Sequence, residues 1–369
     1  MHEAIIVFSH LRWSFVYQRP QQLLARMAER RRVVFFEEPV WDREAAPFLE
    51  CSTPAPGVLV CRPHTPVRQP GYHDEQFPCL LPLLEQLLRE ERLERYLAWF
   101  YTPMALPLVA TLTPRLVVYD CMDELSGFLE APSELAERER ALLARADLVF
   151  TGGPSLYQAK RRHHSQVFCF PSSVDAAHFR LACNAGIEHE SQLSLPRPRL
   201  GYFGVLDERL DLPLLDALAL SHPQWQIVMV GPVLKITPQA LPRHTNISYY
   251  GQQEYAQLPR FLAGWDVCLI PFALNDATRF ISPTKTLEYM AAEKPVVSTP
   301  ITDVAEPYGG IVFIGNGIES FIAGCEQALG LSEQKQRDMV GAMRAVVAAT
   351  SWDATVRAME ELIAAPSQR

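Results

Sequence analysis

Short apolar runs alternate with longer stretches of helical periodicity along most of this chain of 369 residues. In the first half, the runs expected to form strands are residues 4–8, 33–36, 97–101, 116–119, 148–151 and 167–170. Strands that are apolar throughout are buried on both faces, which is typical of parallel sheets covered by helices. The alternation therefore predicts an α/β fold built on parallel sheets.

The second half repeats this pattern after a polar gap at about residues 184–198. Because domains usually hold about 100–200 residues, two domains are expected. We predict an N-terminal domain over residues 1–183, a C-terminal domain over 184–350, and a final amphipathic helix in 351–369 that packs back on the first domain. The Pro-rich stretch 47–78 is expected to be an irregular insertion. In open α/β sheets ligands bind at the carboxyl ends of the strands, so a cleft between the two sheets is the expected site.

The net charge of −8 argues against a nucleic-acid partner, which would favour a basic domain. One basic run, residues 160–164, is either a solvated helix end or a patch for anionic phosphates or a membrane surface. No apolar stretch approaches the ~18–20 residues that span a bilayer, so any membrane contact is expected to be peripheral, at the inner face. The eight cysteines form no Cys-x-x-Cys pair, and the N-terminus has no signal-peptide layout. A cytoplasmic protein without a zinc framework is expected.

One segment in the second half combines several features of an anion site. Ser282 is a favourable N-cap and Pro283 suits the first helical position, so Thr284 and its neighbours would present the free amides of a first turn. Such amides, with the helix dipole, bind anions. Lys285 adds a positive charge there, and Glu288 lies one turn further on the same face, where a carboxylate suits ribose hydroxyls. Taken alone, the segment fits an ordinary capped helix as well as it fits an anion site.

This segment closely resembles the donor motif of the group 1 (family 4) glycosyltransferases. The donor motif is matched by Pro283, Lys285, Glu288 and residues 294–297. Residues 171–175 resemble the family's interdomain segment, and residues 200–204 resemble the first strand and glycine turn of its donor domain. The resemblance implies a GT-B architecture, in which two Rossmann-like domains face each other across a cleft. It places Gly204 in the donor site of the C-terminal domain and the acceptor in the N-terminal domain.

The resemblance implies a hexosyltransferase-type, retaining enzyme that moves a sugar from a nucleotide diphosphate sugar to a hydroxyl of a glycan or glycolipid. The donor would be a co-substrate, and neither a cofactor nor a metal is expected. A role in surface polysaccharide or glycolipid synthesis would fit. Two alternatives remain open, a nucleotide-sugar epimerase of the same fold and a non-catalytic partner subunit that binds nucleotide sugars.

The chain departs from the family pattern at two places. Where many members carry the first glutamate of a Glu-x7-Glu pair, this chain has Phe280, and Arg279 or Asp276 would have to substitute. The residue after the glycine turn is Val205, so Arg209 is the candidate for the phosphate cation there, together with Arg279. The sugar, the nucleotide and the stereochemical course stay open.

Polar and aromatic residues follow the first strand, where they could line the cleft. The candidates for acceptor binding are Arg12, Trp13, Tyr17 and Arg19. Aromatic faces pack on sugar rings, although Trp13 and Tyr17 could equally cover the loop. His10 is a candidate catalytic contact near the reacting sugar.

Two carboxylates follow the strand at 116–119. Asp120 and Asp123 could supply a general base for an acceptor hydroxyl, or one of them could cap the next helical turn. In related enzymes a His or Asp at this place lies near the reacting sugar, so both are candidate catalytic residues.

Overall fold

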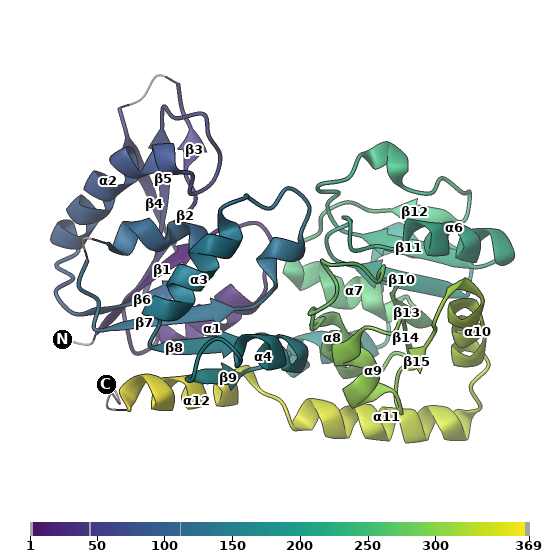
Figure 1. Cartoon of the computed structure of the whole chain (residues 1–369). Coiled ribbons are helices and arrows are strands. Elements are labelled where there is room, and N and C mark those ends of the chain that lie inside the picture. Colours follow the sequence, from purple (N-terminus) through teal and green to yellow (C-terminus); the bar gives the residue numbers. More distant parts are fainter. Residues whose placement is uncertain (1–2, 44–45, 111, 366–369) are drawn as a thin grey trace. The chain divides into compact units, whose positions relative to one another are not determined.

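The computed structural model describes residues 3–43, 46–110 and 112–365, which form two compact units (Figure 1). Unit 1 combines the chain up to Ser126 with Ala131–Pro171 and the chain from Asp353 on. Unit 2 combines Gly127–Glu130 with Ser172–Trp352. The predicted domain limits at residues 1 and 369 lie outside the described residues.

The units change at Pro171/Ser172, whereas the sequence placed the boundary at 183/184. The intervening segment holds helix α5 (Ala176–Arg180), whose Phe179 is fully buried in the core of unit 2. The ring of Phe179 stacks on that of Phe203 at 6.0 Å, and the ring of His178 stacks on Tyr255 at 4.2 Å. Apolar and aromatic packing therefore assigns this segment to unit 2.

Unit 1 is built on a nine-stranded sheet in the order β3-β5-β2-β1-β6-β7-β8-β9, with β4 paired to β5. The strands are β1 (Ala4–Ser9), β2 (Val33–Glu37), β3 (Val40–Trp41), β4 (Phe48–Ala55), β5 (Val58–Thr65), β6 (Tyr96–Phe100), β7 (Leu116–Cys121), β8 (Leu148–Thr151) and β9 (Val167–Cys169). Only β4 runs antiparallel to its neighbour among the described strands. The prediction of an α/β fold on parallel sheets is confirmed.

The stretch 47–78 is not an irregular insertion. Residues 48–65 of this stretch form the β4–β5 hairpin, whose strand β5 pairs in parallel with β2. Pro54 is tolerated because β4 is an edge strand, where a missing amide costs little, and the pairing shifts between Ser52 and Ala55.

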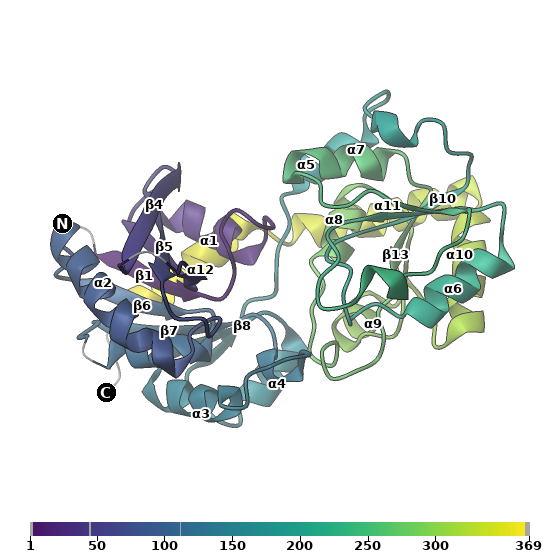
Figure 2. The same cartoon turned by 90° about the horizontal axis from the view of Figure 1, so that it is seen from above.

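Five helices belong wholly or largely to unit 1: α1 (Arg19–Met27), α2 (Phe77–Glu90), α3 (Leu135–Arg145), α4 (Pro154–Lys160) and α12 (Trp352–Ala364). The last of these, α12, lies beside α1 in both views (Figure 2). Ion pairs join Arg26 to Asp353 at 2.8 Å and Arg31 to Glu360 at 2.6 Å. The C-terminal helix is thus held by the N-terminal unit.

Unit 2 is built on a six-stranded parallel sheet in the order β12-β11-β10-β13-β14-β15. Its strands are β10 (Arg199–Phe203), β11 (Gln226–Val230), β12 (Ile247–Tyr249), β13 (Val267–Ile270), β14 (Val296–Ser298) and β15 (Phe313–Ile314). Besides α5, its helices are α6 (Leu212–Ser221), α7 (Leu258–Ala263), α8 (Lys285–Ala291), α9 (Thr302–Tyr308), α10 (Ile318–Leu329) and α11 (Glu333–Ala348).

In each sheet the direction in which successive strands are added reverses once. In unit 2 the chain runs outward from β10 to β12 on one side and from β13 to β15 on the other. In unit 1 the corresponding reversal lies between β1 and β6. Ligands of open α/β sheets bind at such switch points, outside the carboxyl ends of the strands. The segments that follow β1 and β10 are therefore where each unit is expected to bind its ligand.

Candidate functional site

Two glycines close the carboxyl ends of β10 and β11. Gly204 has φ +139° and Gly231 has φ +146°, a region that side chains rarely adopt. The amide of Gly204 donates to the carbonyl of Val230 at 2.8 Å, and a Cβ on Gly231 would overlap the carbonyl oxygen of Gly204. The glycines therefore let the two loops approach closely at the switch point of the sheet.

Lys285 reaches this glycine turn from the first turn of α8. A Cβ on Gly204 would lie 2.7 Å from the Nζ of Lys285, so the ammonium group lies directly beside the turn. The same Nζ lies 5.5 Å from the ring centroid of Tyr202 and 6.0 Å from that of Phe272. Aromatic faces attract a cation at this range. The structure thus brings Gly204 and Lys285 together, as the donor motif implies.

The prediction that Ser282 caps the helix is wrong. Helix α8 begins at Lys285, and Thr284 at its N-terminal boundary has helical backbone angles and makes no capping hydrogen bond through its side chain. Pro283 lies before the helix, where its carbonyl accepts from the amide of Thr286 at 3.2 Å. The amide of Thr286 is thus already hydrogen-bonded within the turn and is less available to an anion. The positive charge of Lys285 therefore contributes more to an anion site here than the end of this short helix.

Glu288 lies one turn beyond Lys285 and is half-buried. Burial raises the pKa of its carboxyl group from 4.5 to about 7, against the lowering effects of Lys285 and of a hydrogen bond with Thr284. A carboxylate that is poorly hydrated and has a nearby cation is ready to accept hydrogen bonds from a ligand.

We expect the replacement of Glu288 by glutamine to raise the free energy of unfolding at pH 8 by about 3 kcal/mol, since the pKa rises from 4.5 to about 7 and each pKa unit is worth about 1.4 kcal/mol. The folded-state pKa of about 7 lies above the ordinary value of 4.5, so the folded chain holds this proton more tightly than the unfolded chain. The resulting stability is complete below pH 4.5 and is lost as the pH rises through 7.

Denaturant unfolding of both proteins at pH 5 and pH 8 measures this difference. Burial also raises the pKa of Glu38 to about 7, so the stability of the variant should still fall between pH 5 and pH 8, but by less than that of the wild type. Equal pH dependence of wild type and variant would show that Glu288 ionises freely.

Thr286 was not predicted from the sequence. Its side chain is 1% exposed, and among the residues that the structure describes its buried hydroxyl has no hydrogen-bond partner. Buried hydroxyls are normally paired, so an unsatisfied one in the first turn of α8 suggests a group supplied by a ligand. A threonine directly after the predicted cation was the available signal.

The two predicted arginines are placed differently. Arg209 is paired with Asp207 at 2.6 Å and its guanidinium lies 5.7 Å from the ring centroid of Phe128, so its charge is already neutralised in part. Arg279 is exposed and stacks on Phe280 at 5.1 Å. Arg209 is thus fixed near the loop after β10, whereas Arg279 is held by the residue that replaces the family's glutamate.

In unit 1, the loop after β1 is anchored to the end of β2. Arg12 pairs with the fully buried Glu37 at 3.2 Å, and the amide of Trp13 donates to the same carboxylate at 2.8 Å. The indole of Trp13 packs edge-on against Phe35 at 5.2 Å. These contacts favour a structural role for Trp13 and Arg12 in shaping the loop.

The two other candidates near that loop, Tyr17 and His10, differ in exposure. Tyr17 is 41% exposed, which suits a residue that packs on a sugar ring. His10 directly follows β1 and is half-buried. Both keep the places that the sequence suggested, at the switch point of the sheet of unit 1.

Arg19 and Asp120 form a buried ion pair. Arg19 is 1% exposed and Asp120 is 0% exposed, and the guanidinium donates to the carboxylate at 2.9 Å and to the carbonyl of Phe170 at 2.6 Å. The prediction of Arg19 as a surface contact for an acceptor therefore does not fit the structure, because its donors are used inside unit 1. Asp120, with a guanidinium on its carboxylate, is equally poorly placed to take a proton.

Asp123 lies just beyond the end of β7 and is half-buried. It is the better placed of the two predicted carboxylates. Near it, Lys160 is 4% exposed and pairs with Glu124 and Glu139, each at 2.7 Å. The basic run 160–164 thus loses its first cation to the interior, which weakens the interpretation of this run as an anionic patch.

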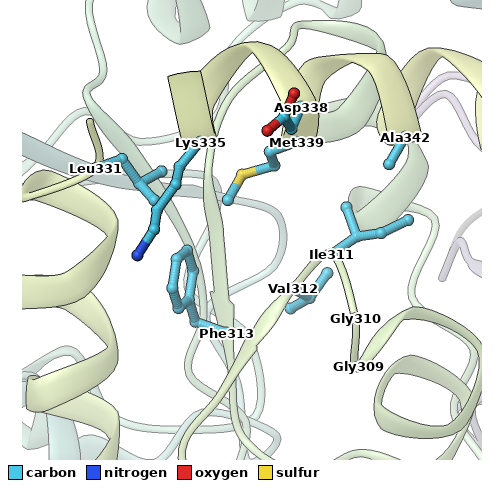
Figure 3. A pocket seen from close by; sticks show the side chains of 10 residues that line it. All are labelled: Gly309, Gly310, Ile311, Val312, Phe313, Leu331, Lys335, Asp338, Met339 and Ala342. Carbon is cyan, nitrogen blue, oxygen red and sulfur yellow. The ribbon is translucent and has the colours of Figure 1, made fainter. Parts of the chain in front are cut away.

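A separate pocket of about 390 Å³ lies in unit 2, between the end of α9, β15 and α11 (Figure 3). Apolar side chains such as Ile311, Phe313 and Met339 line it, with Lys335 and Asp338 on α11. None of the predicted donor residues belongs to its lining. Within the described part of the chain, no cluster of three potential metal ligands occurs, and no helix is long and apolar enough to cross a membrane.

Two α/β units with parallel sheets and the Gly204–Lys285–Glu288 arrangement are the features that the resemblance to GT-B glycosyltransferases implied. A family described as glycosyl transferases group 1 matches residues 197–330, the strands and helices that hold this arrangement. Residues 197–330 therefore carry the match to the group 1 glycosyltransferases.

Known proteins agree with this assignment. The putative teichuronic acid biosynthesis glycosyltransferase TuaH of Bacillus subtilis (strain 168) is 26% identical over 274 residues, which cover 68% of each chain. The fold is similar to sucrose-phosphate synthase from Thermosynechococcus elongatus, with a TM-score of 0.71, 16% identity and 98% coverage of both chains. It is also similar to Anabaena Alr3699/HepE in complex with UDP and glucose, with a TM-score of 0.67, 15% identity, and coverage of 99% of this chain and 100% of the other.

Proposed function

We propose that this glycosyltransferase moves a sugar from a nucleoside diphosphate sugar to a hydroxyl group of a glycan or glycolipid acceptor, with retention of configuration, in the synthesis of a surface polysaccharide. The name of the Bacillus relative, which refers to teichuronic acid biosynthesis, supports the polysaccharide role. A structural neighbour that carries UDP and glucose supports a nucleotide-linked donor. A cytoplasmic enzyme in peripheral contact with the inner face of a membrane would reach a glycolipid acceptor.

The observation that carries the donor assignment is the ammonium group of Lys285 beside Gly204. A glycine at the carboxyl end of the switch-point strand lets a diphosphate approach the backbone, and a cation at the same place neutralises its charge. The unsatisfied hydroxyl of Thr286 is one residue away and can donate to a phosphate oxygen. The donor diphosphate is therefore assigned to the space beside Gly204, Lys285 and Thr286.

Glu288 is assigned to the ribose of the donor. It lies one turn further along α8 than the phosphate cation, and its half-buried carboxylate can accept from two neighbouring hydroxyls. Arg209 is the second candidate cation for the diphosphate, because its ion pair with Asp207 holds it in the loop after β10. Ser282, Pro283 and Thr284 shape the turn that brings Lys285 to this place.

The chemistry follows from the charge that develops on the leaving diphosphate. A fixed cation that is already in place stabilises this charge without reorganisation, and no metal is needed in such a scheme. Arg279 could add to it only after leaving Phe280. On the acceptor side, Asp123, His10 and Tyr17 are the candidates that the packing of unit 1 leaves best placed.

Replacing Lys285 or Glu288 by alanine should weaken donor binding by about 1–3 kcal/mol each, the cost of losing a charge-assisted hydrogen bond. Calorimetry with a panel of UDP, GDP and TDP sugars measures this loss and identifies the nucleotide. The loss for Lys285→Ala should persist with the free nucleoside diphosphate, since the lysine is assigned to the phosphates. The loss for Glu288→Ala should persist with the nucleoside alone.

Lys335→Ala and Glu333→Ala are matched controls, because both exposed residues lie on α11 of the same unit and outside the donor arrangement. Unchanged affinity in both donor variants would rule out the assigned site. Slow release of nucleoside diphosphate from the donor without acceptor supports a transferase. Release accompanied by an epimerised free sugar would indicate an epimerase, and binding with no turnover would indicate a non-catalytic subunit.

A further inference from the structure

Two cysteines face each other across the β4–β5 hairpin of unit 1. Cys51 of β4 and Cys61 of β5 are directly opposed in the antiparallel register. Their Sγ atoms are 3.5 Å apart, and both thiols are free. Neither residue takes part in the proposed transfer reaction, so the pair needs an explanation of its own.

The backbone geometry of this pair suits a disulfide. Directly opposed residues of an antiparallel pair have Cα atoms about 4.5–5.5 Å apart, inside the range of about 4.4–6.8 Å found in disulfides. The sulfurs must approach by about 1.5 Å to reach the bonded distance of about 2.05 Å, which small side-chain rotations can provide. No rearrangement of the two strands is therefore required.

The two thiols differ in access. Cys51 is exposed on the edge strand, whereas Cys61 is 0% exposed. Burial raises the pKa of the Cys61 thiol, and the nearby Arg32, which pairs with Glu91 at 3.0 Å, opposes this effect. A soluble oxidant reaches Cys51 first, and Cys61 is positioned to attack the oxidised sulfur from 3.5 Å away.

We propose that Cys51 and Cys61 form a reversible redox modification site, in which a peroxide converts the two thiols into a disulfide. The Cys51 thiol gives up its proton and its sulfur attacks one peroxide oxygen, the O–O bond breaks, and the hydroxide that leaves takes up this proton, so that a sulfenic acid and one water are formed. The Cys61 sulfur then attacks the sulfenic sulfur, the S–O bond breaks, and a second water leaves. Two thiols are oxidised by two electrons, and the peroxide is reduced to two waters.

The disulfide would tie the edge strand to the sheet. Arg62, next to Cys61, donates to the carboxylate of Glu37 at 2.8 Å, and Glu37 also holds Arg12 and the amide of Trp13. A covalent link at 51–61 therefore restrains a hairpin that is joined to the loop after β1. We expect slower amide hydrogen exchange over residues 48–65 in the oxidised protein.

Peptide mass analysis of the full chain, treated with hydrogen peroxide and then blocked with an alkylating reagent, tests the proposal. Trypsin does not cut between Arg62 and Pro63, so one peptide, residues 44–68, contains both cysteines and no other. This peptide should lose the mass of two hydrogen atoms and escape alkylation, and thiol titration should show the loss of two of the eight thiols. Dithiothreitol should restore both.

Cys51→Ser and Cys61→Ser should each abolish the mass change, whereas Cys183→Ser, which removes another exposed cysteine, should leave it intact. The proposal is overturned if peptide 44–68 stays reduced, or gains only oxygen atoms, even when the peroxide is raised until Cys183 is oxidised as well. It is also overturned if the peptide forms the disulfide but exchange over residues 48–65 does not slow. Because the readouts are mass and exchange, the outcome is independent of the proposed transfer reaction.

Discussion

Replacing Asp120 by alanine is expected to lower the free energy of unfolding by about 3–5 kcal/mol, the typical cost of leaving a buried charge unpaired. The guanidinium of Arg19 would lose its partner at 2.9 Å while it stays enclosed by unit 1. Its remaining contact, with the carbonyl of Phe170, cannot neutralise the charge. Thermal and denaturant unfolding of the purified variant measures the loss.

Two comparisons sharpen this test. The double variant Arg19→Met, Asp120→Leu should regain part of the stability, because it removes the unpaired charge and fills the space with apolar atoms. Glu333→Ala, which breaks the exposed pair with Arg337, should cost at most about 0.5 kcal/mol. If Asp120→Ala instead kept full stability and lost only turnover, Asp120 would be a catalytic residue and the structural role would be wrong.

Replacing Gly231 by alanine is expected to destabilise the chain by about 3–5 kcal/mol, because backbone strain and overpacking each cost about 1–3 kcal/mol. At φ +146° a side chain is strained, and the added Cβ would overlap the carbonyl oxygen of Gly204. A backbone oxygen cannot move aside without shifting the end of β10. Denaturant unfolding of the variant measures the loss.

Gly204→Ala is the informative partner of this variant. Its added Cβ would meet the far end of the Lys285 side chain, which is flexible and can move. We expect a smaller loss of stability, about 1–3 kcal/mol from the backbone strain at φ +139°, together with weaker donor binding because Lys285 is displaced. Equal stability losses in the two variants, or unchanged donor affinity in Gly204→Ala, would contradict the placement of Lys285 beside the glycine turn.

Much of the fold was predictable because apolar runs and helical periodicity are local signals. The central strands of both sheets appear where the apolar runs lie, as in β1 and β13. The β4–β5 hairpin was missed because its strand β4 is largely exposed and contains Pro54, so it has neither alternation nor a continuous apolar run.

The candidate site was predictable in part, for a similar reason. Lys285 and Glu288 stand at fixed spacing on one helix, so their relation follows from the chain itself. The start of α8 could not be predicted in the same way. Ser282 has the chemistry of an N-cap, but the turn from Pro283 to Thr286 places the first helical residue later. Helix boundaries depend on local hydrogen bonds that residue type alone does not decide.

By itself, the sequence determined the class of fold, the central strands of each half, and the spacing of Lys285 and Glu288 on one helix, because each of these depends on residues that are close along the chain. Only the tertiary structure decided which polar residues are free to act. Arg19 and Asp120 are 101 positions apart, and they form a buried ion pair. Two residues that were candidates for the site therefore have a structural role inside unit 1. Gly204 and Lys285 are likewise distant in sequence, and the contact of Tyr289 in α8 with Phe203 in β10 helps to place the cation beside the glycine turn. Burial and pairing arise from contacts between distant segments, which no local pattern specifies.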